Sequence, residues 1–521
     1  VCAQTPTATL SGVARDEQKG GIPKATVKVK HIATGKTRAI STDNAGRYSF
    51  TNLESGSYEL RIEASGYKVT LQSGLTLTVG GALVADVTMS VGEISEQVTI
   101  EAREPLIELN RAGLSRVIET QEIESLPNIG RNFVDFVKLS SGVRLGRENI
   151  TPGVFKEPDV GVGAVAAPRL SFGGQLEFAT LIQVDGADNV QTFTGLPRAT
   201  PSQEAASEFR ILNSTYLAEY GRASGGFVNI ITRSGGNNLN GSLYYFGVND
   251  ALNNRSILNP PDADELQQHQ YGATLGGPIK KDTAFYFVNY EGQRRDESNR
   301  FPQVVQQNLA ALNVFRARFN LAPETINQIR SNDYDLFMGK VNYVIGDNAL
   351  ALRYNYLASD TKNFLGPGAL GSNSTTARNN ETDDQAVVAT LISVLSPRAS
   401  NEARLQFSRR SFDFPSTNFE PAIEVANLLT MGRNVADLDF YEEDRIQVTN
   451  NFSYNLGSHQ FKFGGDYNFI RDESVWNLFL PARIIFPTLN RLLNFTPTTP
   501  LDPTMGPVVF MWPTLLSAPG G

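Results

Sequence analysis

The chain has 521 residues, which is too long for a single hydrophobic core and predicts at least three domains. Its 46 Lys and Arg are outnumbered by 54 Asp and Glu, and the net charge of −8 argues against a phosphate-binding surface, so nucleic acid is not an expected partner. The 45 Gly, 17 Tyr and 30 Phe, with few long apolar runs, indicate a mainly β protein of many strands joined by polar loops.

Cys2 is the single cysteine, so no internal disulfide and no cysteine-based metal cluster can form. Small residues stand three and one positions before Gln4, as in a secretory cleavage site, and we predict that residues 1–7 are a signal-peptide remnant and linker. An arbitrary start and a lipoprotein cysteine are the alternatives. No stretch reaches the roughly 18 apolar residues of a membrane-spanning helix, so a membrane location would require a β-barrel.

Residues 8–92 alternate apolar and polar positions in short runs, as in Ala25 to Lys30 and Tyr58 to Ile62. Tight turns are predicted between such runs at Asp43 to Gly46 and at Glu54 to Gly56, because Asn and Gly accept positive φ angles. The pattern predicts a small antiparallel β-sandwich.

The same region resembles the carboxypeptidase regulatory-like domain, whose fold is similar to that of transthyretin. The resemblance is carried by Gly12-Val13, Gly21 to Val27, Asp43 to Phe50, Leu53 to Tyr58 and Gly66-Tyr67. It implies no peptidase activity, because His31, His269 and His459 are too widely spaced for a zinc protease site. No catalytic group of residues is visible elsewhere, so we expect neither an enzyme nor a cofactor nor a bound metal.

Residues 93–104 are predicted to be a linker that contains an extended, accessible segment. Its core is Glu96, Gln97, Val98, Thr99 and Ile100, which resembles a TonB box, the segment by which TonB-dependent receptors add a strand to TonB. Strand addition requires little beyond an extended backbone with alternating side chains, because main-chain hydrogen bonds supply the affinity. The alternatives are a last strand of the sandwich or a plain linker, and the position between two domains favours the TonB box.

Residues 105–236 change to short helices, strands and glycine-rich loops. Thr120 to Pro127 predicts a helix with Thr120 as its cap and Pro127 as its stop. Asn132 to Leu139 predicts a second helix, with Phe133, Phe136 and Val137 on one face, which is typical of a packed core.

Three linked motifs follow in this region. Leu181 to Val184 predicts a buried strand that ends in an Asp-Gly turn, Ala205 to Leu212 predicts a helix and a strand, and Tyr216 to Gly236 carries Tyr-Gly and Gly-Gly pairs before a Val-Asn-Ile-Ile-Thr strand. In this order the motifs resemble the plug of TonB-dependent receptors, which implies an α+β plug domain. The residues of this plug motif are Asp185, Gly186, Tyr220, Gly221, Gly225, Gly226 and Asn229.

Residues 237–521 show the alternation of antiparallel hairpins. One hairpin joins Ile446 to Leu456 with Phe461 to Phe469, and another joins Phe337 to Ile345 with Ala349 to Tyr356. Strands of about ten residues with one apolar and one polar face suit a partial transmembrane β-barrel with a wet lumen. A soluble sandwich would show the same alternation, so the membrane assignment depends on the plug resemblance.

Tyr271 to Asp282, followed by Phe285 to Gly292, resembles the first barrel hairpin of the Oar-like subgroup of these receptors, which also carries the regulatory-like domain. Long polar inserts near 294–333, 358–383 and 411–444 alternate with tight turns, as outer loops alternate with periplasmic turns. Val304 to Phe319 predicts a helix in the first insert.

We count roughly ten candidate strands after residue 236, whereas barrels of this class close at about 22. An open sheet would leave unpaired backbone groups facing lipid. The segment from Pro481 to Gly521 also lacks a terminal aromatic strand. We therefore expect this chain to be the N-terminal part of a barrel that continues beyond residue 521.

The resemblance implies a receptor in the cell outer membrane, with a periplasmic N-terminal domain, that imports a nutrient when TonB rearranges the plug. The implied partners are TonB with its inner-membrane energising complex, outer-membrane lipid and an extracellular substrate. Iron chelates such as siderophores, oligosaccharides and peptides all stay open as substrates. The alternatives are a surface adhesion or structural barrel without transport, and a secreted protein built from soluble sandwiches.

Overall fold

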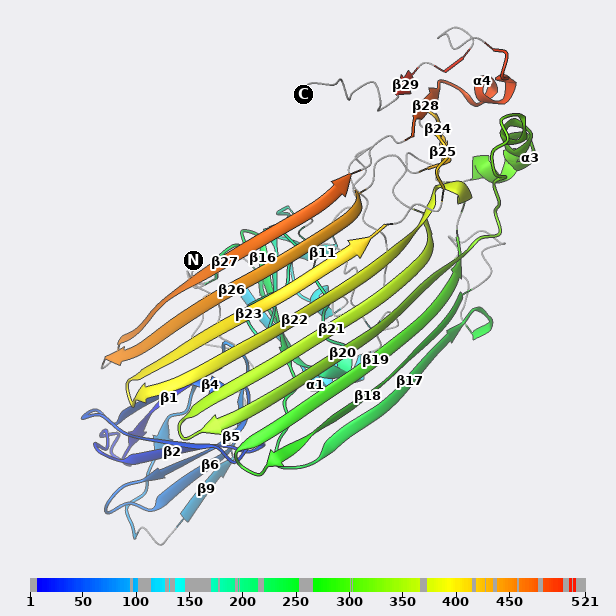
Figure 1. The fold of residues 1–521 in the computed structure, drawn as a ribbon. Helices are drawn as coiled ribbons and strands as arrows, with labels where there is room; N and C mark the ends of the chain where they lie inside the picture. The colour runs from blue at the N-terminus through cyan, green and yellow to red at the C-terminus, as the bar shows by residue number, and fades with distance from the viewer. Residues whose placement is uncertain are drawn as a thin grey trace.

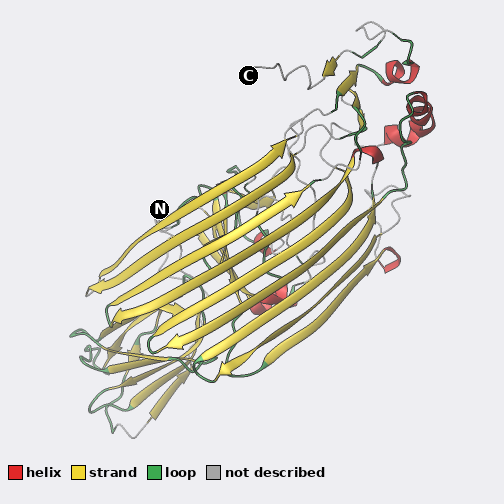
Figure 2. Ribbon diagram, in the orientation of Figure 1, coloured by secondary structure: helices red, strands yellow, loops and turns green. Residues whose placement is uncertain are grey.

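The structure is a computed structural model of the protein. The structure describes residues 7–93, 97–101, 114–126, 131, 136–145, 170–176, 179–192, 195, 197–213, 220–252, 266–299, 301, 303–365, 373–414, 418–426, 428–433, 438–456, 459–476, 481–499, 506–507 and 509–511. Strands dominate it and helices are few (Figure 2), which confirms the mainly β fold class.

The N-terminal part is a sandwich of two sheets around one apolar core. One sheet has the order β4-β1-β7, with β8 also on β1, and the other has the order β3-β2-β5-β6-β9. Alternate side chains of each strand point inward, and Leu10, Val27 and Leu60 are fully buried between the sheets. The strands are β1 (Thr7–Arg15), β2 (Thr26–His31), β3 (Thr37–Ser41), β4 (Arg47–Glu54), β5 (Gly56–Glu63), β6 (Val69–Leu77), β7 (Ala82–Val84), β8 (Val87–Thr88) and β9 (Gln97–Glu101).

A central domain follows, built on a five-stranded sheet of order β10-β15-β16-β13-β14. Phe209, Val228 and Ile182 belong to its core, and Phe136 stacks on Phe209 with ring centroids 5.8 Å apart. Its elements are β10 (Leu114–Glu119), α1 (Thr120–Ser125), β11 (Val143–Leu145), β12 (Leu170–Phe172), β13 (Leu181–Val184), β14 (Ala187–Asp188), the 3₁₀ turn η2 (Gln203–Ala205), β15 (Ala206–Asn213) and β16 (Gly226–Thr232).

The predicted cap of the first helix is wrong. Thr120 is the first helical residue of α1, the N-cap is Glu119, and no side chain caps the helix. The Thr120 hydroxyl donates instead to the carbonyl of Ser207, at 2.6 Å. The Thr therefore ties the helix to the neighbouring strand β15. Pro127 and the first half of the second predicted helix, residues 132–135, lie outside the described residues, whereas 136–137 are helical.

A nine-stranded antiparallel sheet forms the largest part of the molecule, and the central domain packs on one of its faces (Figure 1). Its order follows the sequence from β17 to β23 and then β26 and β27, so β17 and β27 are its edges among the described residues. The strands are β17 (Asn240–Asn249), β18 (Leu266–Lys280), β19 (Ala284–Ser298), β20 (Ile329–Ile345), β21 (Asn348–Leu365), β22 (Ala377–Ser396), β23 (Ala399–Asp413), β26 (Leu438–Leu456) and β27 (His459–Trp476).

We expected the hairpin of β18 with β19 to be the first of the sheet. In the structure β17 precedes it, and all of β17 pairs with β18. The sequence analysis did not single out β17. The predicted hairpins of β20 with β21 and of β26 with β27 are present in the structure, in the registers Ile345↔Asn348 and Leu456↔His459.

The sheet is polar where it is covered and apolar where it is exposed. Along β23, Arg404, Gln406 and Ser408 are buried against the central domain, while Leu405 and Phe407 are 53% and 49% exposed. A water-soluble sandwich would bury the apolar side chains, so this arrangement fits a face that lies against lipid and a polar lumen. It separates the two interpretations that the alternation in the sequence left open.

If this face lies against lipid, a charged side chain on it should destabilise the protein more near the middle of the bilayer than near its surface. Phe407→Arg, near the middle of β23, is expected to destabilise the full-length protein by about 2–4 kcal/mol in a bilayer. Leu395→Arg, next to the end of β22, places the same charge near the interface and should cost about 0–1 kcal/mol. Urea unfolding in lipid vesicles measures both, and equal costs at the two depths would contradict a membrane-spanning sheet.

Short turns and long loops lie at opposite ends of the sheet. Residues 281–283, 346–347 and 397–398 are turns beside the sandwich, whereas long connections including 299–328 and 414–437 lie at the other end (Figure 1). We call these the turn end and the loop end. The strand boundaries confirm the predicted alternation of long inserts with tight turns.

At the loop end, segments distant in sequence form one small domain, which we call the loop domain. It comprises α3 (Gln303–Arg318), β24 (Ala422–Val425), β25 (Leu429–Met431), β28 (Arg483–Phe486), α4 (Leu489–Asn494) and β29 (Val509–Met511). Phe315, Met431 and Phe486 are in its apolar core. The short 3₁₀ turns η3 (Asp250–Leu252) and η4 (Ser374–Thr376) lie in other connections of the sheet. Helix α3 confirms the predicted loop helix.

Candidate functional site

The predicted Asp-Gly turn joins β13 to β14 in a tight hairpin that faces the polar side of the sheet. Asp185 and Gly186 have φ angles of 48° and 77°, and this left-handed pair is what a two-residue hairpin turn requires. Asn229 on the neighbouring β16 accepts a hydrogen bond from the Gly186 N–H at 3.1 Å, which fixes the turn within the central domain.

Asp185 joins the central domain to two cations of the sheet. Its carboxylate lies 2.8 Å from Arg353 Nη1 and 3.5 Å from Lys340 Nζ. It also accepts hydrogen bonds from the Thr232 N–H at 2.9 Å and the Thr232 hydroxyl at 2.7 Å. Burial alone would raise the pKa of Asp185, but the two cations and the hydrogen bonds outweigh burial and lower the pKa to about 2. The carboxylate is therefore charged at every physiological pH.

The rest of the hairpin makes further contacts with β23 and β26. The Gly186 carbonyl accepts from Arg404 at 2.7 Å, and the Asp188 N–H donates to Gln447 at 2.9 Å. The Asp188 carboxylate forms an ion pair with Arg445 at 2.7 Å. The hairpin thus presents both its backbone and its acids to polar side chains of the sheet.

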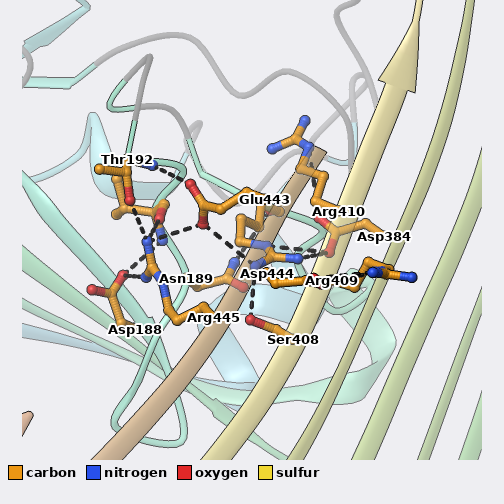
Figure 3. Close-up of polar contacts among 12 residues, drawn as sticks. Asp188, Asn189, Thr192, Asp384, Ser408, Arg409, Arg410, Glu443, Asp444 and Arg445 are labelled. Carbon is orange, nitrogen blue, oxygen red and sulfur yellow. Dashed lines mark hydrogen bonds and ion pairs between the residues drawn. The ribbon is translucent and has the colours of Figure 1, made fainter. Parts of the chain in front are cut away.

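A second group of contacts surrounds Arg198, in the loop after β14. Figure 3 shows Asp384, Glu443 and Thr192 of this group. Arg198 lies 2.8 Å from Asp384 of β22 and 3.6 Å from Glu443 of β26, and all three side chains are 3% exposed or less. Asp384 also accepts from the Ala199 N–H at 2.9 Å, and Glu443 accepts from the Thr192 N–H at 2.8 Å. Removing one member of such a group weakens the charge compensation of the buried members that stay.

We call this set of contacts the anchor. Its central-domain members are Asp185, Gly186, Asp188, Thr192, Arg198 and Ala199, and its sheet members are Lys340, Arg353, Asp384, Arg404, Glu443, Arg445 and Gln447. Of these, only Asp185 and Gly186 were predicted. The missed sheet members stand at polar positions of strands with an alternating pattern, and apart from the neutral Gln447 their charge was the only signal in the sequence.

The other predicted motif residues lie just before β16 and at its first residue. Tyr220 packs on Phe227 with ring centroids 5.2 Å apart. A Cβ at Gly226 would lie 2.1 Å from the Phe172 ring, and one at Gly225 would lie 3.3 Å from Gln175. Gly221 follows Tyr220 and is half-buried. Tyr220, Gly225 and Gly226 thus serve close packing, whereas Asp185 and Gly186 belong to the anchor and Asn229 holds their turn.

Gly226→Ala is expected to destabilise the central domain by about 1–3 kcal/mol, because the added methyl overlaps the Phe172 ring. Gly465→Ala in β27 is the matched control, since a Cβ there meets no atom within 4 Å. Protease susceptibility of the central domain in increasing urea measures the difference. Equal behaviour of the two variants would mean that Gly226 is not tightly packed.

The predicted TonB box lies at an edge of the sandwich. Gln97 to Glu101 form β9, which pairs in parallel with β6 in the register Thr70↔Val98 and Leu71↔Thr99. Val98 is 38% exposed, and Glu96 lies outside the described residues. The structure thus places this segment as the last strand of the sandwich, one of the alternatives, and its role as a TonB box stays a prediction.

In the described part of the chain, no three His, Cys, Asp or Glu side chains are grouped as metal ligands would be. His31 is buried and its Nδ1 lies 2.7 Å from the Thr34 hydroxyl. None of the described helices has the length and apolar character needed to cross a bilayer.

Comparisons with known proteins match this architecture. Residues 9–90 match the carboxypeptidase regulatory-like domain, and residues 231–313 and 298–487 match the outer membrane beta barrel domain. Over 268 residues the chain is 23% identical to the TonB-dependent transporter Oar of Myxococcus xanthus, a stretch that covers 49% of this chain and 23% of Oar.

Among solved structures, the outer membrane transporter YddB from Escherichia coli is similar with a TM-score of 0.52 and 11% identity, over 72% of this chain and 50% of YddB. The siderophore receptor PirA from Acinetobacter baumannii gives a TM-score of 0.48 and 17% identity, over 70% of this chain and 49% of PirA. The chain therefore spans about half the length of these structures. The similarity to YddB shows a shared fold.

Outer-membrane barrels have short periplasmic turns and long extracellular loops. The turn end with its sandwich is accordingly periplasmic, and the loop domain is extracellular. The chain thus carries a regulatory-like domain and an outer membrane beta barrel domain, is related to the TonB-dependent transporter Oar and shares a fold with YddB, and these matches place it in the cell outer membrane.

Proposed function

We propose that this receptor imports a nutrient across the outer membrane, with the central domain acting as a plug that TonB rearranges. The observation that supports this most strongly is the polar character of the anchor. Buried ion pairs contribute little net stability, because desolvation offsets their attraction. Water can also replace each partner once the contact opens. Such polar contacts suit a plug that must detach from the barrel wall and bind again better than an apolar interface would.

The position of the anchor suggests the order of events. Lys340 and Arg353 each lie five residues from the turn-side ends of their strands, Ile345 and Asn348, so the Asp185 contact is near the periplasm. The Arg198 contact lies deeper in the sheet. Force applied from the periplasm at residues 96–100 would therefore reach the Asp185 contact first.

A deletion strain grown on a panel of iron chelates, oligosaccharides and peptides tests the proposal. We expect a growth defect on one nutrient class, restored by the wild-type gene, and binding of that nutrient by purified full-length protein. Normal growth on every source, together with loss of surface attachment, would favour an adhesion barrel instead. Recovery of the protein from the soluble periplasm would favour a secreted binding protein.

A further inference from the structure

The sandwich packs against the turn end of the sheet and against the central domain. The Thr51 hydroxyl of β4 lies 2.9 Å from the Ser400 hydroxyl of β23. The Ala33 carbonyl accepts from the Asn237 N–H, before β17, at 2.9 Å. The N-terminal sandwich is thus in contact with the sheet at β23 and with the segment just before β17.

Its contact with the central domain includes both backbone groups of one residue, Val79. Glu208 of β15 accepts the Val79 N–H at 2.9 Å, and the guanidinium of Arg210, two residues further on the same strand face, donates to the Val79 carbonyl. Val79 and Arg210 are fully buried and Glu208 is 6% exposed. We call Glu208, Arg210 and Val79 the clamp.

The sandwich loop is shaped for this contact. Gly80 has a φ of +61°, and a Cβ there would lie 3.4 Å from Arg210 Nε. Val79 lies two residues after the end of β6, the strand that pairs with β9. The same strand therefore connects the clamp to the predicted TonB box.

The docked sandwich helps enclose a cavity of about 630 Å³ between the three parts of the chain. Its walls come from the sandwich at 31–34 and 76–78, from the central domain at 119–121 and 231–235, and from the sheet at Lys340, Arg353 and Thr390. Both cations that hold Asp185 line it. The cavity therefore lies directly beside the periplasmic contact of the anchor.

We propose that the sandwich is a periplasmic gate: the clamp holds it across this cavity, and release of Val79 lets it move away so that cargo can leave. The gate rests on the proposed import function, but the clamp itself does not. The gate would give the regulatory-like domain a role in transport, although this domain lies far from the extracellular loops.

The clamp contains one titratable group in the neutral range. Burial raises the pKa of Glu208 to about 7. Hydrogen bonds from Ser55 and Val79 and the positive charge of Arg210 lower the pKa but do not outweigh burial. The negative charge of Glu119, on the paired strand β10, also raises it. A carboxyl whose pKa is higher when docked than when free favours docking at low pH. Docking is therefore strongest below the ordinary pKa of 4.5 and is lost as the pH rises through about 7.

Hydrogen exchange of the Val79–Gly81 amides in the full-length protein, without TonB, tests the clamp. Protection relative to β5 amides is expected to fall about tenfold from pH 6 to pH 8 after correction for intrinsic rates. Glu208→Gln keeps an acceptor without a charge and should remove this pH dependence, and Glu208→Ala should lose protection at both pH values. Glu124→Gln, an exposed carboxylate of the same domain, is the control and should behave as wild type.

Protection that is unchanged in Glu208→Ala, with β5 amides still protected, would overturn the clamp.

The gate is tested by Thr51→Cys with Ser400→Cys in a Cys2→Ser background, which tethers the sandwich to the sheet. Uptake should stop when the disulfide forms and return on reduction, with ligand binding unchanged. Normal uptake through a tethered protein would overturn the gate. If wild type itself imports nothing, the import function fails, while the exchange experiment still decides the clamp.

Discussion

Asp185→Ala is expected to loosen the seating of the central domain by about 3–5 kcal/mol, since it leaves Lys340 and Arg353 buried without a counter-charge. The triple change with Lys340→Met and Arg353→Met should recover most of this loss, because apolar side chains can replace a buried ion group at little cost. Urea-dependent protease cleavage of the central domain in the full-length protein measures the effect.

Asp360→Ala is the matched control, because its pair with Lys362 is 46% and 60% exposed and should contribute less than about 1 kcal/mol. The pH dependence adds a second check. Since the pKa of Asp185 falls from 3.8 to about 2 in the folded protein, its contribution is complete above pH 4 and is lost as the pH drops toward 2. An Asp185→Ala variant as resistant as Asp360→Ala would show that Asp185 does not seat the plug.

Val98→Pro is expected to abolish energised uptake while extracellular ligand binding stays at the wild-type level. Proline removes a backbone donor and restricts the preceding residue, so the segment can no longer pair as a regular strand. Losing one or two main-chain hydrogen bonds of about 1 kcal/mol each should weaken strand addition to TonB by about tenfold or more. Uptake of labelled nutrient and pull-down with the periplasmic part of TonB measure the two effects.

Val84→Pro provides the control for Val98→Pro. Val84 is a comparably exposed residue of β7, in the other sheet of the sandwich, so its replacement disturbs an edge strand without touching residues 96–100. Uptake should survive in this variant. Normal uptake in Val98→Pro would remove the TonB-box assignment.

The local structure was largely predictable because it follows from periodicity and turn chemistry. Alternation along β23 and β26 defines their two faces, and Asp185-Gly186 supplies the left-handed pair that the β13–β14 turn needs. Periodicity could not decide which face meets water. The identity of the water-facing side became clear only from the contact between the polar face of the sheet and the central domain.

The tertiary contacts of the site were not predictable from one sequence. Arg198 and Asp384 are 186 positions apart, and their meeting depends on strand register and on how the central domain sits in the sheet. The loop domain draws its core from Phe301 to Phe495, across several long connections, so no single window shows its periodicity. Likewise the pairing of β9 with β6 could not be separated from a free TonB box, because both require the same extended pattern.

The most direct test of the account is a tether between plug and barrel. Ser202 Oγ lies 3.0 Å from Asn289 Oδ1 of β19, so cysteines at both positions in a Cys2→Ser background are placed to form a disulfide. Import by plug rearrangement predicts that the oxidised protein still binds its nutrient but does not take it up, and that reduction restores uptake. Undiminished uptake with the disulfide intact would contradict the account.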